Sequence, residues 1–261
     1  MGLSLQTFPT AAEAQSALSE AGTCYMGGGT LVVRAANEGN LSFSTIVRTT
    51  DPALSEIEVA GGKVTIGASV TMKAILAHPD LGFLTPAARA VGGPAVRNMA
   101  TVGGNLFAPA PFGDLTVALL ALDATVSVGG NDISLEDFVK GRDKAGGLVT
   151  SVTFRASSGL RFLKVSRVHP KGVAVLTIAA DLNVDDDKVG SARIALGCMA
   201  GHAIRARAAE KALTGQPLTK DGIAVALAAA AEGTDPPTDA IASAWYRREV
   251  LPVHLGRLLL G

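Results

Sequence analysis

The chain has 261 residues, enough for one large hydrophobic core or for two domains. Lys and Arg total 23 and Asp and Glu also total 23, so the formal net charge at pH 7 is zero. That balance argues against a nucleic-acid-binding protein and against a surface held to anionic lipid by charge. Hydrophobic residues make up 48% of the chain and aromatic residues only 4%, which indicates a globular protein whose cores are built from small side chains.

The cysteine and histidine content limits the metal chemistry of the chain. Cys24 and Cys198 are too few for an iron–sulfur cluster held by four thiolates, and the four histidines lack the spacing of metal ligands. The chain opens without a charged and then apolar leader, and it contains no run of 18 apolar residues. We therefore expect a cytoplasmic protein in a reducing compartment, with no metal site and no membrane span.

The first predicted elements lead into a glycine-rich loop. Thr10 and Glu13 form the pattern of a capping box, which predicts a helix over residues 11–18. A strand-like step at residues 23–26 runs directly into the glycines at 27–29. The loop has neither the G-x-G-x-x-G spacing of a dinucleotide fingerprint nor the lysine of a Walker loop. By itself, this loop is a weak indication of a ligand site.

Short strands and helices are predicted through the next hundred residues. The pair Gly61-Gly62 predicts a hairpin turn. The alternating or β-branched segments predict strands at residues 46–47, 57–59, 63–66, 125–128 and 148–154. The helical patterns lie at residues 71–76, 84–91, 115–122 and 135–139, of which 115–122 is almost wholly apolar and is expected to be buried.

A second glycine-rich stretch, residues 96–114, is the most informative part of the chain. Gly103 and Gly104 follow Thr101 and precede Asn105, and Asp114 closes the stretch. Glycines let a ligand approach the main chain, whose amides can then surround anionic oxygens, whereas a carboxylate can only accept and suits a sugar hydroxyl. A single Gly-Gly pair is more often a plain turn. Two such stretches in one half of the chain favour a nucleotide-cofactor cradle.

The character of the sequence changes near residues 155–160. A basic run follows, formed by Arg161, Lys164, Arg167, His169 and Lys171. Beyond it the pattern predicts an Ala- and Val-rich run at 172–181, an acidic turn at 185–187, a strand at 191–196 and helices at 204–213, 221–231 and 240–260. In the last helix, we expect Trp245 and Tyr246 to pack as anchors.

With these motifs in view, the chain resembles the FAD-binding medium subunit of the molybdenum hydroxylases. That family includes the middle subunit of aerobic carbon monoxide dehydrogenase and the flavin domain of xanthine dehydrogenase. The resemblance rests on Gly-Gly-Gly-Thr at 27–30, Arg-Asn-Met-Ala-Thr-Val-Gly-Gly-Asn at 97–105, Asp-Leu at 114–115, Phe-Leu-Lys-Val-Ser-Arg at 162–167 and Trp-Tyr-Arg at 245–247. It is collinear and covers nearly the whole chain.

The resemblance implies an α+β fold. A two-subdomain FAD-binding domain of the PCMH type, which is similar to that of vanillyl-alcohol oxidase, would occupy residues 1–157, with subdomains at about 1–50 and 51–157. A smaller α+β C-terminal domain of the carbon monoxide dehydrogenase flavoprotein type would occupy residues 158–261.

The resemblance also implies FAD as the cofactor and assigns its contacts. Main-chain amides of residues 27–33 and 101–104 would bind the pyrophosphate, and two loops would supply the several donors that two desolvated phosphates need. Polar side chains would hold ribityl or ribose hydroxyls, an apolar one would pack near the adenine or flavin edge, and a lysine would lie beside the flavin. The implied cofactor-binding residues are Gly27, Gly28, Gly29, Thr30, Leu31, Val32, Thr101, Val102, Gly103, Gly104, Asn105, Asp114, Leu148 and Lys164.

Two positions depart from the family pattern. Leu31 stands where the family often has Asp or Ser, and Gly172-Val173-Ala174 stands where Asp-Ile-Ala is common. The second departure lies where the resemblance places the flavin edge, so the redox potential or the partner contacts would differ there.

The implied function is electron transfer within a multi-subunit complex, and no residue of this chain is expected to be catalytic. A molybdopterin-binding large subunit would oxidise the substrate. Electrons would pass through a small 2Fe–2S subunit to the FAD of this chain and then to NAD, oxygen or a quinone, in a heterotrimer that is single or dimerised. Two alternatives are a free-standing FAD-dependent oxidoreductase and a non-catalytic FAD-binding assembly module.

Overall fold

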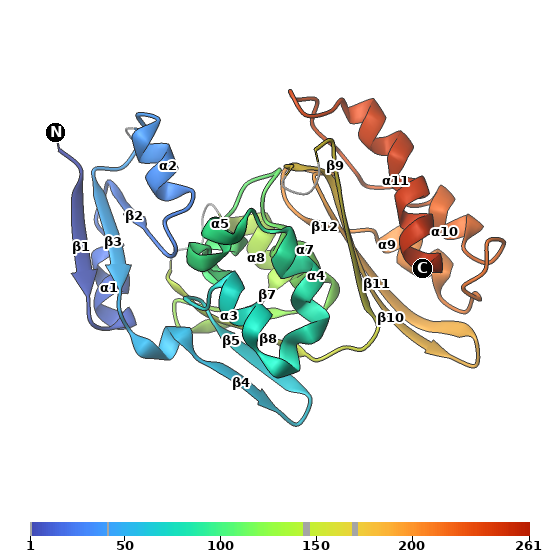
Figure 1. Cartoon of the computed structure of the whole chain (residues 1–261), viewed down its shortest axis with the longest axis horizontal. Helices are drawn as coiled ribbons and strands as arrows, with labels where there is room; N and C mark the ends of the chain where they lie inside the picture. The colour runs from blue at the N-terminus through green and yellow to red at the C-terminus, as the bar shows by residue number, and fades with distance from the viewer. Residues whose placement is uncertain (1, 41, 143–146, 169–171) are drawn as a thin grey trace.

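The computed structural model describes residues 2–40, 42–142, 147–168 and 172–261. His169 and Lys171 of the predicted basic run lie outside these residues. Figure 1 shows three sheets that follow one another along the chain, each with its own helices. They have three, five and four strands.

The first sheet is small and parallel, with the strand order β1-β3-β2. Its strands are β1 (Ser4–Phe8), β2 (Thr23–Tyr25) and β3 (Thr45–Thr49), and its helices are α1 (Ala11–Ala17) and α2 (Val32–Asn37). The capping box is confirmed, because the Thr10 hydroxyl accepts from the Glu13 amide and the Glu13 side chain accepts from the Thr10 amide. Neither β1 nor α2 was among the elements predicted from the sequence.

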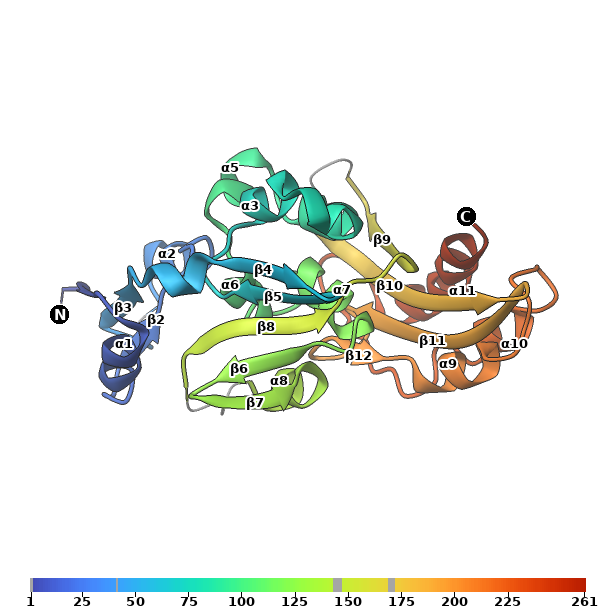
Figure 2. The ribbon, with the colours of Figure 1, turned by 90° about the horizontal axis from the view of Figure 1, so that it is seen from below.

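The second sheet is antiparallel, with the order β4-β5-β8-β6-β7 (Figure 2). Its strands are β4 (Ile57–Ala60), β5 (Lys63–Gly67), β6 (Thr125–Val128), β7 (Asn131–Ser134) and β8 (Val149–Arg155). The helices are α3 (Met72–Ala77), α4 (Thr85–Ala90), α5 (Pro94–Met99), α6 (Val102–Leu106), α7 (Asp114–Ala121) and α8 (Leu135–Gly141), with 3₁₀ turns at Pro52–Ser55 and Pro79–Leu84. The predicted hairpin is confirmed: Gly61 and Gly62 both have positive φ, between β4 and β5.

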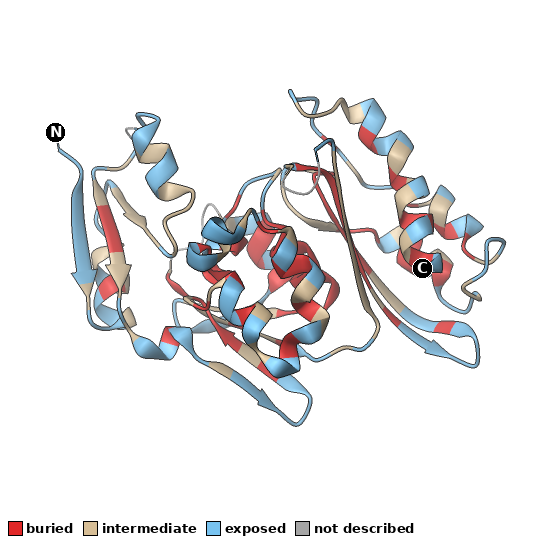
Figure 3. Ribbon diagram, viewed as in Figure 1, coloured by how far each residue is buried: buried red, intermediate tan, exposed pale blue. Residues whose placement is uncertain are grey.

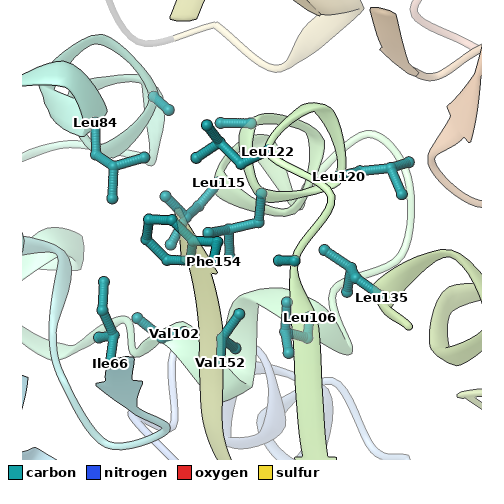
Figure 4. Packing of buried hydrophobic residues seen from close by; sticks show 14 of the residues in the cluster. Ile66, Leu84, Val102, Leu106, Leu115, Leu120, Leu122, Leu135, Val152 and Phe154 are labelled. Atoms are coloured by element: carbon teal, nitrogen blue, oxygen red, sulfur yellow. The ribbon is translucent and has the colours of Figure 1, made fainter. Parts of the chain in front are cut away.

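Helix α7 lies at the centre of the molecule. All eight of its residues are buried, as the apolar run predicts, and Leu115 and Leu120 contribute to the largest core cluster (Figures 3 and 4). Strands β5, β6 and β8 supply other side chains of that cluster, such as Val152. Helix α7 also contacts strands of the third sheet. The largest core therefore extends across both halves of the chain.

The third sheet is antiparallel, with the order β12-β11-β10-β9. Its strands are β9 (Leu160–Ser166), β10 (Ala174–Asp185), β11 (Lys188–Gly197) and β12 (Ile204–Arg205), and its helices are α9 (Arg207–Leu213), α10 (Ala224–Ala228) and α11 (Ala244–Leu260). The acidic turn is confirmed between β10 and β11. The predicted helix over 204–213 starts three residues late, because Ile204 and Arg205 pair with β11. The helix predicted over 221–231 is restricted to α10.

Helix α11 is attached by Arg247, which the sequence singles out only as part of the Trp-Tyr-Arg motif. Arg247 is 1% exposed, and its guanidinium donates to the Val175 carbonyl at 2.9 Å and to both carboxylate oxygens of Asp239 at 3.0 Å. Trp245 and Tyr246 are 68% and 44% exposed. The expectation that these two aromatic residues anchor the helix is therefore wrong, since the buried guanidinium group of Arg247 performs that role through its hydrogen bonds to Val175 and Asp239. Over the described residues, no helix is both long and apolar enough to cross a membrane.

Candidate functional site

The first glycine loop joins the end of β2 to the start of α2, and it presents a row of main-chain donors. The amide before the row, that of Met26, donates to the Val47 carbonyl, and the amide after it, that of Val33, donates to Gly29. Between them, the six amides of residues 27–32 have no hydrogen-bond acceptor in the described part of the chain. Gly29 has φ +75°, a conformation that glycine adopts without strain. This loop can therefore offer several donors to an anion.

The second glycine stretch contains the short helix α6, which was not predicted. The amides of its first turn already have hydrogen-bond acceptors from the segment after β5. The Val102 amide donates to the Val70 carbonyl at 2.9 Å, and the Gly103 amide donates to the Ala68 carbonyl at 2.8 Å. The Gly104 amide donates to the Thr101 hydroxyl at 3.1 Å. These three amides were expected to serve the pyrophosphate. In this structure they have acceptors already. Among the described residues, the amides of the two loops that lack an acceptor are those of residues 27–32 and of Thr101.

The two glycine loops are in direct contact, although they lie far apart in the sequence. A Cβ atom added at Gly28 would overlap the carbonyl oxygen of Met99, and one added at Gly27 would lie 2.7 Å from the Thr101 hydroxyl. Since a contact this close leaves no space for a side chain, the absence of side chains at Gly27 and Gly28 is what lets the loops meet. The expectation that both loops belong to one site agrees with this geometry.

Asn105 ties α6 to α7. Its side-chain oxygen accepts from the amide of Thr116 at 3.0 Å and from the Thr116 hydroxyl at 3.1 Å. Asn105 is 7% exposed, and its side-chain nitrogen has no acceptor among the described residues. The amide group is thus fixed through its oxygen, while its nitrogen is left as a donor for a hydroxyl of a ligand.

Asp114 and Lys164 form a buried ion pair that joins the two halves of the chain. The Lys164 ammonium group lies 2.8 Å from Asp114 and donates to the Ala90 carbonyl at 3.0 Å, and the Thr177 hydroxyl donates to Asp114 at 3.1 Å. Burial raises the pKa of the Asp114 carboxyl, and the charge of Lys164 offsets part of that rise. Asp114 was expected to accept from a sugar hydroxyl. In this structure both of its oxygens serve Lys164 and Thr177.

Leu148 is positioned between the first and second sheets. It is 4% exposed and packs in a small cluster with Ala14 and Val47 of the first sheet's layer. Its amide donates to the side chain of Gln15. Its expected contact with adenine or the flavin edge stays a prediction.

Three groups that shape the site were not predicted from the sequence. The carbonyls of Ala68 and Met99 and the side chain of Gln15 shape the glycine loops and hold Leu148. Main-chain carbonyls leave no trace in residue type, so no local signal could have revealed the first two. No group of three or more His, Cys, Asp or Glu side chains within the described ranges could hold a metal.

Comparison with known proteins identifies the family of the chain and its cofactor. Residues 5–154 match the family of the FAD binding domain in molybdopterin dehydrogenase, and residues 161–261 match the CO dehydrogenase flavoprotein C-terminal domain. The chain belongs to the FAD-binding medium subunits of the molybdenum hydroxylases. FAD is its cofactor, and the chain is a subunit of a molybdenum-containing oxidoreductase. The unpaired amides beside two close-packed glycines suit the diphosphate of that cofactor.

Individual relatives share about three tenths of their residues with the chain. The glyceraldehyde dehydrogenase medium chain of Sulfolobus acidocaldarius is 28% identical over 213 residues, which cover 77% of this chain and 76% of the relative. The 6-hydroxypseudooxynicotine dehydrogenase complex subunit alpha of Paenarthrobacter nicotinovorans is 31% identical over 217 residues, covering 78% and 73%.

Solved structures share the fold. Carbon monoxide dehydrogenase from Hydrogenophaga pseudoflava, in a form that lacks the Mo-pyranopterin moiety, superposes with a TM-score of 0.91 at 22% identity, covering 99% of this chain and 96% of that one. Quinoline 2-oxidoreductase from Pseudomonas putida 86 gives 0.89 at 24%, covering 100% and 96%. The predicted α+β fold, a PCMH-type FAD-binding domain followed by a smaller C-terminal domain, is confirmed.

Proposed function

We propose that this chain passes electrons from a small 2Fe–2S subunit through FAD to an external acceptor, while a molybdopterin-binding large subunit oxidises the substrate. The names of the relatives as a medium chain and a complex subunit support such an assembly. The acceptor is NAD, oxygen or a quinone, and the complex is a heterotrimer in the cytoplasm. The observation that carries the proposal is the row of unpaired amides at residues 27–32, seated on the second glycine loop.

The chain's own residues bind and orient the cofactor. The amides of residues 27–32 and of Thr101 donate to the diphosphate, and the Asn105 side-chain nitrogen donates to a sugar hydroxyl. Bound FAD supplies the capacity to take up and release electrons singly or in pairs. Lys164, held by Asp114 and the Ala90 carbonyl, keeps a positive charge beside the flavin. Lys164 belongs to a C-terminal domain that we place at 158–261, and the other cofactor-binding residues belong to a domain that we place at 1–157.

Leu148 has a supporting part in this proposal. The hydrogen bond that its main-chain amide donates to the Gln15 side chain and its packing against Ala14 hold the start of β8 against the first sheet. We expect this contact to fix the distance between the subdomains that flank the cofactor.

Thr30, Leu31 and Val32 contribute through their main-chain amides. The departure from the family pattern at Leu31 therefore leaves these hydrogen-bond donors unchanged.

The first experiment tests FAD binding with a matched pair of glycine variants. Gly28→Ala places a methyl group against the Met99 carbonyl and pushes the first loop away, whereas Gly82→Ala fills open space. We expect Gly28→Ala to weaken FAD binding by about tenfold or more, equivalent to at least roughly 1.4 kcal/mol, and Gly82→Ala to bind as wild type. Flavin absorbance of the purified chains and fluorescence titration of the apoproteins measure this effect, and thermal unfolding of each apoprotein reports whether it is folded.

The proposal fails if the folded wild-type chain cannot be reconstituted with FAD. The proposal also fails if Gly28→Ala retains wild-type affinity for FAD.

A second measurement separates the electron-transfer subunit from the two alternative functions. Substrate should reduce the flavin only when the molybdenum- and iron-containing subunits are present. Turnover by the chain alone would identify a free-standing oxidoreductase, and tight FAD binding without reduction in the complex would identify an assembly module.

A further inference from the structure

The carboxyl end of α4 presents four consecutive carbonyls, those of residues 89–92, to two cations. The Nη1 atom of Arg97 donates to three of them, and the ammonium group of Lys164 donates to the fourth, that of Ala90, at 3.0 Å. The carbonyls that Arg97 binds are those of Arg89 at 3.1 Å, Val91 at 3.5 Å and Gly92 at 2.6 Å. The last carbonyls of a helix have no partner inside the helix, and cations stabilise them. Two cations from different elements therefore share one turn of main chain.

Arg97 reaches this turn from α5, the helix that leads into the second glycine loop. Helix α5 ends at Met99, whose carbonyl oxygen closely approaches Gly28 of the first loop. The turn also packs closely on α5, because a Cβ atom added at Gly92 would lie 2.7 Å from Val96. Arg97 therefore fixes the end of α4 relative to the wall of the cofactor site.

Lys164 reaches the same turn from β9, in the other half of the chain. An ammonium group has three N–H donors. Two of them have acceptors in the structure, Asp114 at 2.8 Å and the Ala90 carbonyl at 3.0 Å. The third has no acceptor among the residues that the structure describes. Because the three N–H bonds have a fixed tetrahedral arrangement, the positions of the two acceptors determine where the third bond points.

We propose that Arg97 is a positioning residue for Lys164. Arg97 holds the turn at residues 89–92, and thereby the Ala90 carbonyl, so that the third N–H of Lys164 is directed at the bound flavin. Asp114 alone leaves the ammonium group free to rotate about their shared hydrogen bond, whereas Asp114 and Ala90 together fix it. The inference rests on the proposed function, which places Lys164 beside the flavin. Arg97 itself needs no contact with the cofactor.

The first test compares two arginines at the same end of α4. Arg97→Met removes the donor from three carbonyls and lets the turn relax. A misdirected N–H of Lys164 loses part of one charge-assisted hydrogen bond, so the affinity for FAD should fall by about fivefold. Arg89→Met is the matched control, because it removes a positive charge from an exposed position on the last turn of α4, and it should bind FAD as wild type. Fluorescence titration of the apoproteins measures the affinity, and thermal unfolding reports whether each apoprotein is folded.

A double-mutant cycle shows whether Arg97 acts through Lys164. The background variant Lys164→Met/Asp114→Asn removes the ammonium group and its counter-ion together. In this background, Arg97→Met should change the affinity for FAD by less than about twofold. The visible circular dichroism of the bound flavin gives a second readout, because it depends on the groups around the flavin ring. Arg97→Met should change this spectrum in the otherwise wild-type chain and leave it unchanged in the background variant.

Conservative variants test the kind of contact that Arg97 makes. All three of its hydrogen bonds to the turn come from one nitrogen atom, so a single ammonium donor can replace it. Arg97→Lys should therefore bind FAD to within about twofold of wild type. Arg97→Gln has a shorter side chain and should resemble Arg97→Met. It takes the place of Arg97→Met in the cycle if that apoprotein does not fold.

Three results would overturn the proposal. The first is an affinity of Arg97→Met and Arg97→Gln equal to that of Arg89→Met. The second is an equal loss of affinity in the wild-type chain and in the background variant, which would show that Arg97 acts through the second glycine loop instead. The third is an Arg97→Lys variant as weak as Arg97→Met. A wild-type chain that fails to bind FAD would instead overturn the proposed function, so the two failures are distinguishable.

Discussion

Lys164 is the residue on which the junction between the two halves depends. It extends from β9 to Asp114 at the first turn of α7, and the two side chains are 16% and 6% exposed. A carboxylate with so little access to water depends on its counter-ion, because burial disfavours its charged form. The buried charge of Asp114 is therefore compensated by a residue that lies 50 positions away in the sequence.

Removal of that counter-ion should destabilise the chain. Lys164→Met leaves the Asp114 carboxylate buried without its partner, and we expect a loss of about 3 kcal/mol in the free energy of unfolding at pH 7. Because burial holds the pKa of Asp114 above its ordinary value, the carboxyl gains a proton as the pH falls, and the loss should shrink toward acid pH. Urea unfolding at several pH values measures it.

The matched control is the double variant Lys164→Met/Asp114→Asn, which removes both charges. It should be more stable than Lys164→Met alone. Equal stability of the two variants would show that Asp114 does not depend on the charge of Lys164.

At the scale of elements, α11 is held by the hydrogen bonds of Arg247 rather than by aromatic packing. Ser243 caps the start of the helix, because its hydroxyl accepts from the Tyr246 amide, and Arg247 follows in the first turn. The guanidinium group reaches the carbonyls of Val175 in β10 and of Ala242 before the helix. One side chain thereby joins the helix, the loop before it and the sheet beneath it.

Arg247→Met should loosen α11. The substitution leaves the buried carbonyl of Val175 and the carbonyl of Ala242 without their donor, with an expected loss of about 2 kcal/mol. Arg248→Met removes the neighbouring charge, which is exposed and paired only weakly with Asp235 at 3.9 Å, and should cost less than about 1 kcal/mol. Thermal and urea unfolding compare the two. Equal losses would contradict the assignment of Arg247 as the anchor.

The elements with regular apolar periodicity or clear turn residues were predictable from the sequence. Helix α7 followed from its apolar run, and the β4–β5 hairpin followed from its glycine pair. Helix α6 was not predictable, because glycine disfavours helix. The amides of the first turn of α6 donate to the carbonyls of Ala68 and Val70, which lie far away in the sequence. Strand β9 was hidden by its basic residues, one of which is Arg161. Its guanidinium caps the carboxyl end of α11.

For the candidate site, the loops were predictable from the sequence, but their hydrogen-bond partners were not. Glycine patterns pointed to both loops, and the loops are in contact. Residue types could not show which loop keeps unpaired amides, because this depends on which amides find acceptors after folding. Asp114 was singled out for its charge, but its partners Lys164 and Thr177 come from distant strands.

At the scale of the whole molecule, other ion pairs also cross between the two halves, and one of them involves Glu136. Glu136 of α8 contacts Arg207 of α9 and also Lys140. Burial by itself would raise the pKa of the Glu136 carboxyl, but the hydrogen bond from Lys140 and the charge of Arg207 outweigh it, so the pKa lies below its ordinary value. The pair therefore contributes stability at neutral pH that is lost as the pH falls through this lowered pKa.

Glu136→Gln should remove this pH dependence. Arg207 is 60% exposed and solvent screens the pair, so we expect a loss of less than about 1 kcal/mol at pH 7. The difference from wild type should vanish in acid, where the wild-type carboxyl is protonated. Denaturant unfolding at neutral and acid pH measures it. A difference that persists at acid pH would assign the effect to packing rather than to charge.

The complete burial of α7 has a consequence for how the chain unfolds. The helix precedes the seam between the two family matches, yet it packs against β10 and β11 beyond that seam. A fragment cut at the seam would expose one flank of its most apolar helix, and the remaining fragment would lose the layer that covers its sheet. Because the two halves share this core, we expect heat to melt them in one cooperative step.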